Sequence, residues 1–560
     1  MNKVITTLTS AIVATTIMAS GYAKKCNIKY KDYITMYADE DNHQTPQNHL
    51  LVIDYKNMKL LDKYVVPGVL NHHADPLGTL DKANYVMMVP KGSNFTTIRS
   101  LKDGSFVKKI RLPFRPRSAD TYNSKYNLVL LNSRDRPAAV LIDTIKLKIV
   151  GKAGFNIKCS QNKPYPLSID EVYSNKEILD PNYKCTQLDF GGDQISGHPL
   201  WVSSEEFVIV DRANRMLHLY KIRKNGDKFD TKLVQTINTI SSLHQVIPKD
   251  KTNPNNKIFY GMTEGNEGIN TVAGVYKFRL VGNKLKKEAF TPLVTYPGVG
   301  INGHNLYIDP KHKYLYAPAG KRGNGGYYSN YFYYLNMIDF NNYLSWWQSY
   351  SNIIYQYWQM VATDPYYNII YSNTNGVVFI IDANSMKIVK IINTGKGAGH
   401  VAFSKQKGIA IVTNHLDNYL TAIDYKNMTF LKNIYLPFPS INIASLKQSH
   451  MQHVSEDGKY YYNFWSDGGY FFRVNLDTLE VDKSIEVDGV PIQGNFYKHI
   501  SQNCNIPTPA PDDGYDDFFS NSSSSGKVKT IQTVGKTKAK SSYIERNSKE
   551  SSKDHNDYDK

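Results

Sequence analysis

Histidines recur at equivalent points of a repeated unit in this chain. The sequence has 15 histidines in 560 residues, and several of them open a short segment that a turn closes soon afterwards. Neutral imidazole is the commonest side-chain metal ligand, and groups of imidazoles suit copper, zinc, iron or nickel. The pattern predicts a metal or cofactor site wherever the fold brings these residues together. The candidate ligands are His72, His73, His198, His244, His304, His400 and His450.

A hairpin motif recurs at a constant distance before histidines of this repeat. An apolar run ends in Asp or Asn, and a Leu, Ile or Met follows four residues later, as after Asp54 and Asp382. Asp and Asn start tight turns because their side chains bond to nearby backbone N–H groups. Asp54 precedes His72 by 18 residues, and Asp382 precedes His400 by 18. The flanking segments are apolar or alternate with period two, which is typical of half-buried strands.

The spacing of the repeat predicts a β-propeller. One register position recurs at intervals of 41 to 60 residues, apart from one interval of 80. A period of this length with four short strands in each unit indicates propeller blades. We expect an all-β fold with eight blades, or alternatively seven, and a leading hairpin at 49–66 that helps to close the ring. The register residues are His72, Ser118, His198, His244, His304, Gln359, His400 and His450.

The composition divides the chain into three parts. Residues 1–23 have the charged start, apolar stretch and small residues of a secretory signal peptide. We expect the β-propeller over 24–507, with insertions at about 157–197 and about 321–358. The segment 508–560 is rich in Pro, Asp, Ser and Lys, which predicts a disordered tail. The mature protein is therefore expected to be periplasmic or secreted, with no transmembrane segment.

The net charge indicates the class of binding partner, and the cysteines indicate possible disulfides. The net charge of +17 favours anions, acidic partners or anionic membranes, and no motif indicates nucleic acid. Export permits disulfides, and four cysteines allow three connectivities. We favour Cys159 with Cys185 and Cys26 with Cys504. No Cys-x-x-Cys spacing indicates a thiolate metal site.

Propeller geometry gives the histidines two interpretations. The first strand of each blade lines the ring, so residues that open these strands converge at one end. That arrangement predicts a shared metal site. Gly-His pairs at the junctions of WD-type propellers are instead structural, and this alternative stays open. The adjacent pair His72 and His73 favours ligation, because a structural network needs one His per blade. His218, His312 and His415 fall in second strands or turns, where we expect surface or packing roles.

The hairpins, exemplified by residues 378–389, resemble the repeats of the YVTN/cytochrome d1-like propeller superfamily over roughly residues 49–490. The histidine pattern also resembles the propellers of two exported copper enzyme families, nitrous oxide reductase and thiocyanate dehydrogenase. The pair His72 and His73 matches the adjacent histidines of nitrous oxide reductase. No cupredoxin segment follows, and the haem c motif of cytochrome cd1 nitrite reductase is missing, so haem d1 is the less favoured cofactor.

Two functions remain open from the sequence. The first is an exported copper protein whose histidine-lined site acts as an oxidoreductase on a small inorganic substrate. The second is a non-catalytic propeller that binds a protein partner or ligand and uses its histidines structurally. Glu264, Glu267 and Asp75 are candidate acids or bases, without a paired spacing that singles them out.

Overall fold

The structure, a computed structural model, describes residues 29–499 apart from internal gaps. The predicted signal peptide, the four cysteines, His304, Gln359, Glu267 and the tail at 508–560 lie outside the described residues. Most of the insertion expected at about 157–197 also lies outside them. The gaps are 31, 42–47, 69–70, 80–81, 120, 158–194, 251–256, 265–272, 294–301, 304–305, 324–325, 338–341, 350–359, 365, 367–368, 375, 442–446 and 488.

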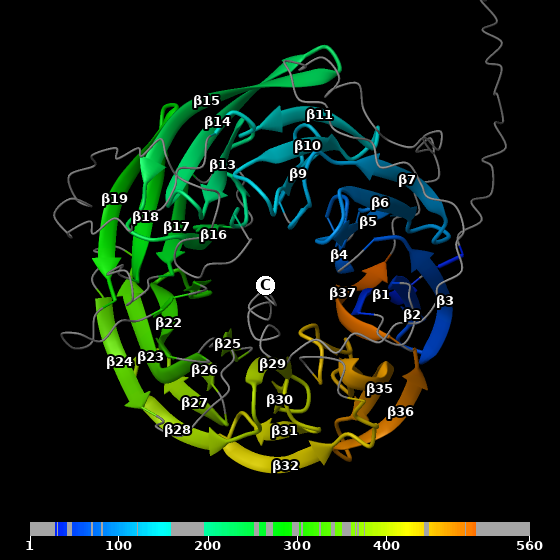
Figure 1. The fold of residues 1–560 in the computed structure, drawn as a ribbon. Coiled ribbons are helices and arrows are strands. Elements are labelled where there is room, and N and C mark those ends of the chain that lie inside the picture. The colour runs from blue at the N-terminus through cyan, green and yellow to red at the C-terminus, as the bar shows by residue number, and fades with distance from the viewer. Residues whose placement is uncertain are drawn as a thin grey trace, which may run out of the picture.

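The described strands form nine antiparallel sheets arranged as a ring (Figure 1). In eight sheets the strands follow chain order from the centre of the ring to its rim. The first four of these sheets are β4 (Asn71–Pro76), β5 (Tyr85–Pro90), β6 (Phe95–Ser100) and β7 (Phe106–Arg111); β8 (Thr121–Asn123), β9 (Leu128–Asn132), β10 (Ala139–Asp143) and β11 (Lys148–Ala153); β12 (Leu200–Trp201), β13 (Glu206–Asp211), β14 (Met216–Asn225) and β15 (Lys228–Asn238); and β16 (Leu243–Pro248), β17 (Ile258–Thr263), β18 (Gly274–Val281) and β19 (Lys284–Pro292).

The next four sheets continue around the ring, and the first of them has five strands. A short 3-10 helix, η2 (Ser466–Gly468), separates two strands of the last one. These sheets are β20 (Asn302–Gly303), β21 (Tyr307–Ile308), β22 (Tyr314–Gly323), β23 (Gly326–Asn336) and β24 (Asn342–Ser349); β25 (Met360–Thr363), β26 (Ile369–Thr374), β27 (Val377–Asp382) and β28 (Ile388–Asn393); β29 (Ala398–Ser404), β30 (Ile409–Asn414), β31 (Tyr419–Asp424) and β32 (Thr429–Tyr435); and β33 (His453–Val454), β34 (Tyr460–Trp465), β35 (Tyr470–Asn475) and β36 (Glu480–Glu486).

The ninth sheet closes the ring with strands from both ends of the described chain. Its order is β3 (Lys59–Val66), β2 (Asn48–Asp54), β1 (Asp32–Asp41) and β37 (Val490–His499), so β37 takes the central place. Met36 of β1 faces Asn495 of β37 in this pairing. The predicted all-β propeller is confirmed. The leading hairpin is β2–β3, and it belongs to a ninth sheet beyond the eight units that we counted.

The core is divided among the interfaces between neighbouring sheets. Nine apolar clusters are present among the described residues, and each joins one sheet to the next around the ring. Strand β27 shows how one strand serves two interfaces. Val378 and Ile380 pack toward β29–β32, whereas Phe379 and Ile381 pack toward β22. Successive strand residues point to opposite faces, so a strand buried on both faces needs an unbroken apolar run.

The hairpin motif adopts one turn geometry. The carboxylate of Asp143 accepts from the backbone N–H groups of Ile145 and Lys146, both at 2.8 Å. Leu147, four residues after Asp143, has φ 51° and donates its N–H to the Asp143 carbonyl at 2.8 Å. The fifth residue of the other hairpins repeats the positive φ: Met58, Met386, Met428 and Leu479. The aspartate turn predicted from the sequence is confirmed.

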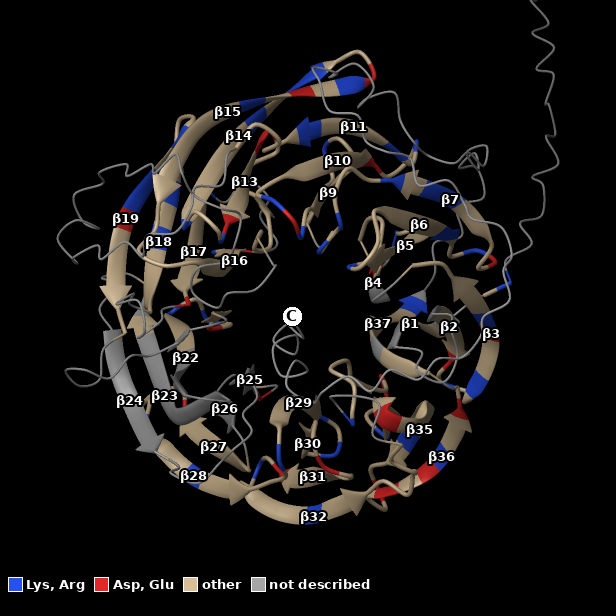
Figure 2. Ribbon diagram, in the orientation of Figure 1, with Lys and Arg blue, Asp and Glu red and all other residues tan. Residues whose placement is uncertain are grey.

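Charge collects on the outer strands. Figure 2 shows Lys and Arg along β7, β11 and β15, whereas Asp and Glu mark β36. The rim strand β36 is mostly exposed, in contrast to fully buried strands such as β13. No helix among the described residues has the length and apolarity needed to cross a membrane.

Candidate metal centre

Three register histidines lie where the first strand of a sheet departs from regular pairing. Between β29 and β30 the pairing shifts after Ala398 and resumes at Val401, so His400 lies in the irregularity. His244 lies in the equivalent shift between β16 and β17, and His72 in the shift between β4 and β5. Bulges of this kind re-aim a side chain and are frequent beside functional sites. These three histidines therefore share one backbone position in their sheets.

Three histidines from two neighbouring sheets meet in one group. His400 opens β29, His415 directly follows β30, and His450 lies on the segment that leads into β33. One ligand nitrogen from each residue lies within 4.8 Å of the other two. The ring centroids are 5.3 Å apart for His400 and His415, 5.5 Å for His400 and His450, and 4.8 Å for His415 and His450. We call these residues the histidine triad.

The triad needs little movement to hold a metal ion. Tetrahedral ligation at metal–nitrogen distances of about 2.1 Å places ligand nitrogens about 3.4 Å apart. Side-chain rotations that move each nitrogen by less than about 1 Å would bring the 4.8 Å group to that spacing. His415 is 2 % exposed and His450 6 %, while His400 is half-buried. His400 is therefore the most exposed member of the triad.

The orientation of His415 is set by two neighbours. Its Nδ1 lies 2.9 Å from the Gln448 carbonyl oxygen, which can only accept, so Nδ1 carries the proton and Nε2 keeps the lone pair that a metal needs. Gly399 packs against the same ring. A Cβ at Gly399 would lie 2.5 Å from both Cδ2 and Nε2 of His415, so no larger residue fits without moving the ring.

Hydrogen bonds fix the main chain around His415 and His450. His415 N–H donates to the Gly397 carbonyl at 2.9 Å, and Lys447 N–H donates to the His415 carbonyl at 2.7 Å. The buried Gln448 amide donates at 2.9 Å to the carbonyl of Asn414 and at 2.9 Å to that of Asp417. These bonds join the β29–β32 sheet to the segment that carries His450. The triad thus spans an interface between two sheets.

Burial keeps the triad neutral. Desolvation, with a smaller contribution from His415, lowers the pKa of His400 to about 3. Desolvation lowers the pKa of His415 to about 4, although its bond to the Gln448 carbonyl opposes the shift. The pKa of His450 is also well below its usual range, first because of burial and then because of His415, His400 and Lys91. Neutral imidazoles are the protonation state that binds metal.

His198 and His244 form a different arrangement. Their rings lie 5.0 Å apart at an angle of 73°. Arg117 donates to His244 Nε2 at 2.8 Å and to the Ser196 carbonyl, and Ser118 Oγ lies 3.2 Å from His198 Nδ1. A guanidinium cannot accept, so Nε2 of His244 carries its lone pair toward Arg117. This is a buried polar network of the kind that the structural interpretation anticipated.

The remaining candidate residues from the sequence lie outside the triad or outside the described part of the structure. His72 and His73 lie in β4, and their side chains are outside the described part of the structure, as is His304. Ser118, a register residue, donates its backbone N–H and its hydroxyl to Asn132 Oδ1, at 2.9 and 3.0 Å. Glu264 forms a buried ion pair with Arg212 at 2.6 Å. Among the described residues, His400 and His450 are the predicted ligands that belong to the triad.

Sequence reasoning missed His415, for which we expected a packing or surface role. The signal was available in the hairpin itself. The turn at 405–408 folds β30 back along β29, and Ala398 pairs with Asn414. Residue 415 therefore returns to the end of the ring where His400 begins its strand. His218, assigned in the same way, does lie in a packing position, bonded at 2.9 Å to both Thr236 and Asp211.

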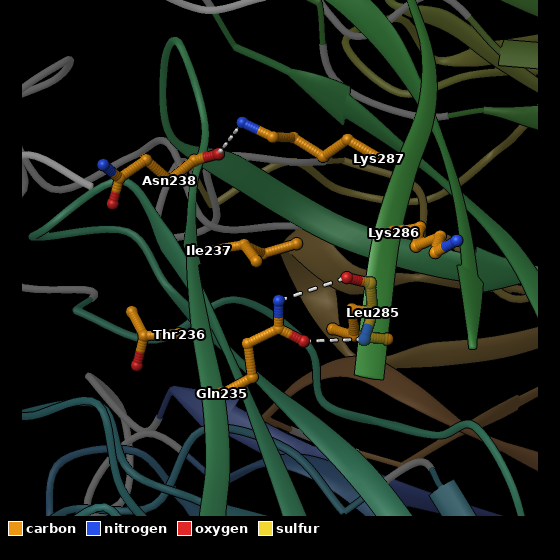
Figure 3. Close-up of a pocket in the computed structure, with 7 residues that line it drawn as sticks. All are labelled: Gln235, Thr236, Ile237, Asn238, Leu285, Lys286 and Lys287. Carbon is orange, nitrogen blue, oxygen red and sulfur yellow. Dashed lines mark hydrogen bonds between the residues drawn. The ribbon is translucent and has the colours of Figure 1, made fainter. Parts of the chain in front are cut away.

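A cavity of about 310 Å³ lies away from the triad, between the outer strands β15 and β19. Figure 3 shows Gln235 and Ile237 directed toward β19. The Gln235 side chain bonds to the backbone of Leu285 at 2.7 and 3.2 Å, and Lys287 donates to the Asn238 carbonyl at 3.2 Å. Burial lowers the pKa of Lys287. These bonds connect neighbouring sheets at the rim.

Several solved structures are similar to this chain at low sequence identity. No protein-family model matches the chain, and no curated protein matches its sequence. Dihydro-heme d1 dehydrogenase NirN is similar in structure with 13% identity, covering 83% of this chain and 75% of its own, at a TM-score of 0.44. A eukaryotic initiation factor has 8% identity, covers 84% and 99%, and has a TM-score of 0.46.

A third similar structure is apo AztD from Citrobacter koseri, with 10% identity, coverage of 73% of this chain and 96% of its own, and a TM-score of 0.40. Likenesses at these identities and TM-scores carry no argument about function. The propeller itself rests on the nine four- and five-stranded sheets and the strand pairing that closes them.

Proposed function

We propose that this protein is an exported metalloprotein whose histidine triad binds one copper ion. The observation that carries the proposal is the convergence of three imidazole nitrogens within 4.8 Å, two of them from nearly inaccessible residues. A buried histidine is normally satisfied by hydrogen bonds in a structural network, as His244 is by Arg117. Three neutral imidazoles facing one another instead suit a shared cation.

Copper is the ion that this donor set favours. Imidazole binds copper, zinc, iron and nickel, and divalent copper stands highest among these in intrinsic affinity for nitrogen donors. The triad offers three protein ligands, which is the number that leaves a coordination position open for substrate. Bound copper would supply a one-electron redox centre and a Lewis acid. We therefore propose an oxidoreductase that acts on a small inorganic substrate, in the periplasm or outside the cell.

The chain's own residues would perform the supporting steps. His415, held by Gln448, would present Nε2 toward the ion, and the half-buried His400 would border the path by which substrate enters. Gly399 keeps the space beside His415 free of a side chain. The low pKa values of His400 and His415 mean that no proton must leave these ligands before the ion binds at neutral pH.

Metal content of the purified mature protein tests the proposal. After copper loading and removal of excess ion, we expect about one equivalent of copper per chain. The variant His415→Ala should lose most of it, and His312→Ala, which changes an exposed turn histidine, should retain it. Fractionation of producing cells tests export. Copper content unaffected by His415→Ala would contradict the assignment of the site.

A second function, binding of a protein partner, is favoured by a different observation. Apolar side chains are exposed on the neighbouring rim strands β28 and β32, among them Ile391, Phe430 and Tyr435. Exposed apolar groups gathered on one surface mark interaction sites. Replacement of Phe430 and Tyr435 by serine should abolish a partner complex recovered from the native source and leave copper content unchanged. A partner complex that survives both substitutions would count against a partner at this rim.

A further inference from the structure

The charge of the triad bears on the class of molecule that it accepts. The group consists of three histidines, without a carboxylate or thiolate among the described residues that form it. Histidine binds a metal ion as the neutral imidazole, so the three residues bring no charge to the site. A divalent ion placed among them would keep its full double charge. An uncompensated charge in a buried position is strongly unfavourable, so such a site attracts a compensating anion.

The surroundings of the triad add positive charge. Lys91 directly follows β5, the second strand of its sheet, just as His415 directly follows β30. The second strands end where the first strands begin, so both residues lie at the same end of the ring. Lys91 is 5 % exposed, and its charge acts on His450. The protein as a whole carries +17, which raises the local concentration of anions.

The three members of the triad differ in exposure. His415 and His450 are almost fully buried, whereas His400 is half-buried. Gly399 itself has no side chain to place against the His415 ring. His400 is therefore the member of the triad that lies nearest to solvent. A three-residue ligand set leaves a coordination position for a small molecule bound directly to the metal.

We propose that the open position of the metal-loaded triad takes a small inorganic anion, and that it discriminates against neutral molecules of the same size. This inference rests on the proposed function, because it requires a bound metal ion. The neutral ligand set makes the anion the partner that balances the charge of the site. The substrate of the proposed oxidoreductase is accordingly an anion rather than a neutral gas or solvent-like molecule.

Azide titration of the copper-loaded protein at constant ionic strength tests the inference. Copper content is measured first, and its absence would remove the proposed function itself. With copper bound, azide should produce a saturable charge-transfer band and an altered electron paramagnetic resonance spectrum at about one anion per copper. Neutral acetonitrile at the same concentration should leave both spectra unchanged. Copper-loaded protein without an azide response, or with an equal response to acetonitrile, would overturn the inference.

Two variants separate charge from shape. His415→Asp keeps three protein ligands but makes one of them anionic, so azide affinity should fall by about tenfold or more. Lys91→Met keeps the whole ligand set and should also weaken azide binding, with copper affinity retained. Lys313→Met, which changes an exposed lysine beside Tyr314, is the matched control and should bind azide like the unchanged protein. Undiminished azide affinity in both Lys91→Met and a copper-loaded His415→Asp protein would refute the charge argument.

Discussion

The imidazole of His415 donates from Nδ1 to the main-chain carbonyl of Gln448 at 2.9 Å, across the boundary between two sheets. This contact joins the hairpin that carries His400 and His415 to the segment that carries His450. Second-layer contacts of this type fix the tautomer and the direction of a metal-binding histidine. The triad thus depends on how two propeller sheets dock, as well as on the three histidines themselves.

Replacement of Gln448 by leucine should weaken copper binding by about 10- to 100-fold. The Gln448 amide holds the carbonyls of Asn414, Asp417 and Tyr419, and its loss frees the loop that positions His415. Competition with a chromophoric chelator measures the affinity. Gln235→Leu is the matched control. It also removes partly buried hydrogen bonds from a glutamine side chain to the backbone, but Gln235 lies at the rim of the ring, away from the triad.

Both glutamine variants should lose stability by about 1–3 kcal/mol. Only Gln448→Leu should change copper affinity and the electron paramagnetic resonance signature of the bound ion. Equal copper affinities in the two variants would show that Gln448 has a purely structural role.

Gly399→Ala should displace the His415 ring and reduce copper binding. The added methyl group would lie 2.5 Å from Cδ2 and Nε2 of His415, closer than carbon and nitrogen atoms approach one another. Gly261→Ala in β17 provides the comparison, because its nearest contact is 3.1 Å from a Val246 methyl group that can shift. Copper titration of both variants checks the prediction. Full occupancy with unchanged affinity in Gly399→Ala would mean that the ring can relocate without leaving the site.

The metal-free protein should lose stability as the pH falls from about 6.5 toward 4. His400 and His415 have folded-state pKa values of about 3 and about 4, below the unfolded value, so the unfolded chain takes up more protons in this range. Protonation therefore favours unfolding, and the stability conferred by neutral burial is complete only above the unfolded pKa. Each such histidine contributes a slope of about 1.4 kcal/mol per pH unit.

Urea denaturation at several pH values measures this slope. His415→Gln should flatten it by the contribution of one histidine, and His312→Gln, an exposed turn position, should leave it unchanged. A slope that is the same in His415→Gln and in the unchanged protein would contradict neutral burial of His415.

The sequence allowed the local features of the fold to be predicted, because they depend on short-range chemistry. The turn after Asp143 follows from a side chain that bonds two nearby N–H groups, and the apolar run of β27 follows from burial on both faces. Closure of the ring has no such local signal. β1 and β37 lie about 450 residues apart, and no residue pattern in either segment identifies the strand with which it pairs. The ninth sheet was missed for this reason.

The site was predictable in part for the same reason. His400 and His450 share a register that the hairpins reveal, whereas His415 joins them only through the antiparallel return of β30. His198 and His244 share that register as well, yet Arg117 occupies the position beside His244 that a metal would need. A common register places histidines at one end of the ring. Their neighbours decide whether they ligate a metal or support the fold.

Arg117→Met should destabilise the protein without changing its copper content. Arg117 is 3 % exposed and donates to His244 Nε2 and to the Ser196 carbonyl, so its removal leaves two buried acceptors without that donor. Such losses cost about 1–3 kcal/mol of unfolding free energy. Arg223→Met, which breaks an ion pair of an arginine that is 82 % exposed, should cost less than about 1 kcal/mol. Urea denaturation and copper analysis of the two variants provide the measurements. A gain of copper in Arg117→Met would place a second metal site at His198 and His244, with Arg117 as the group that blocks it.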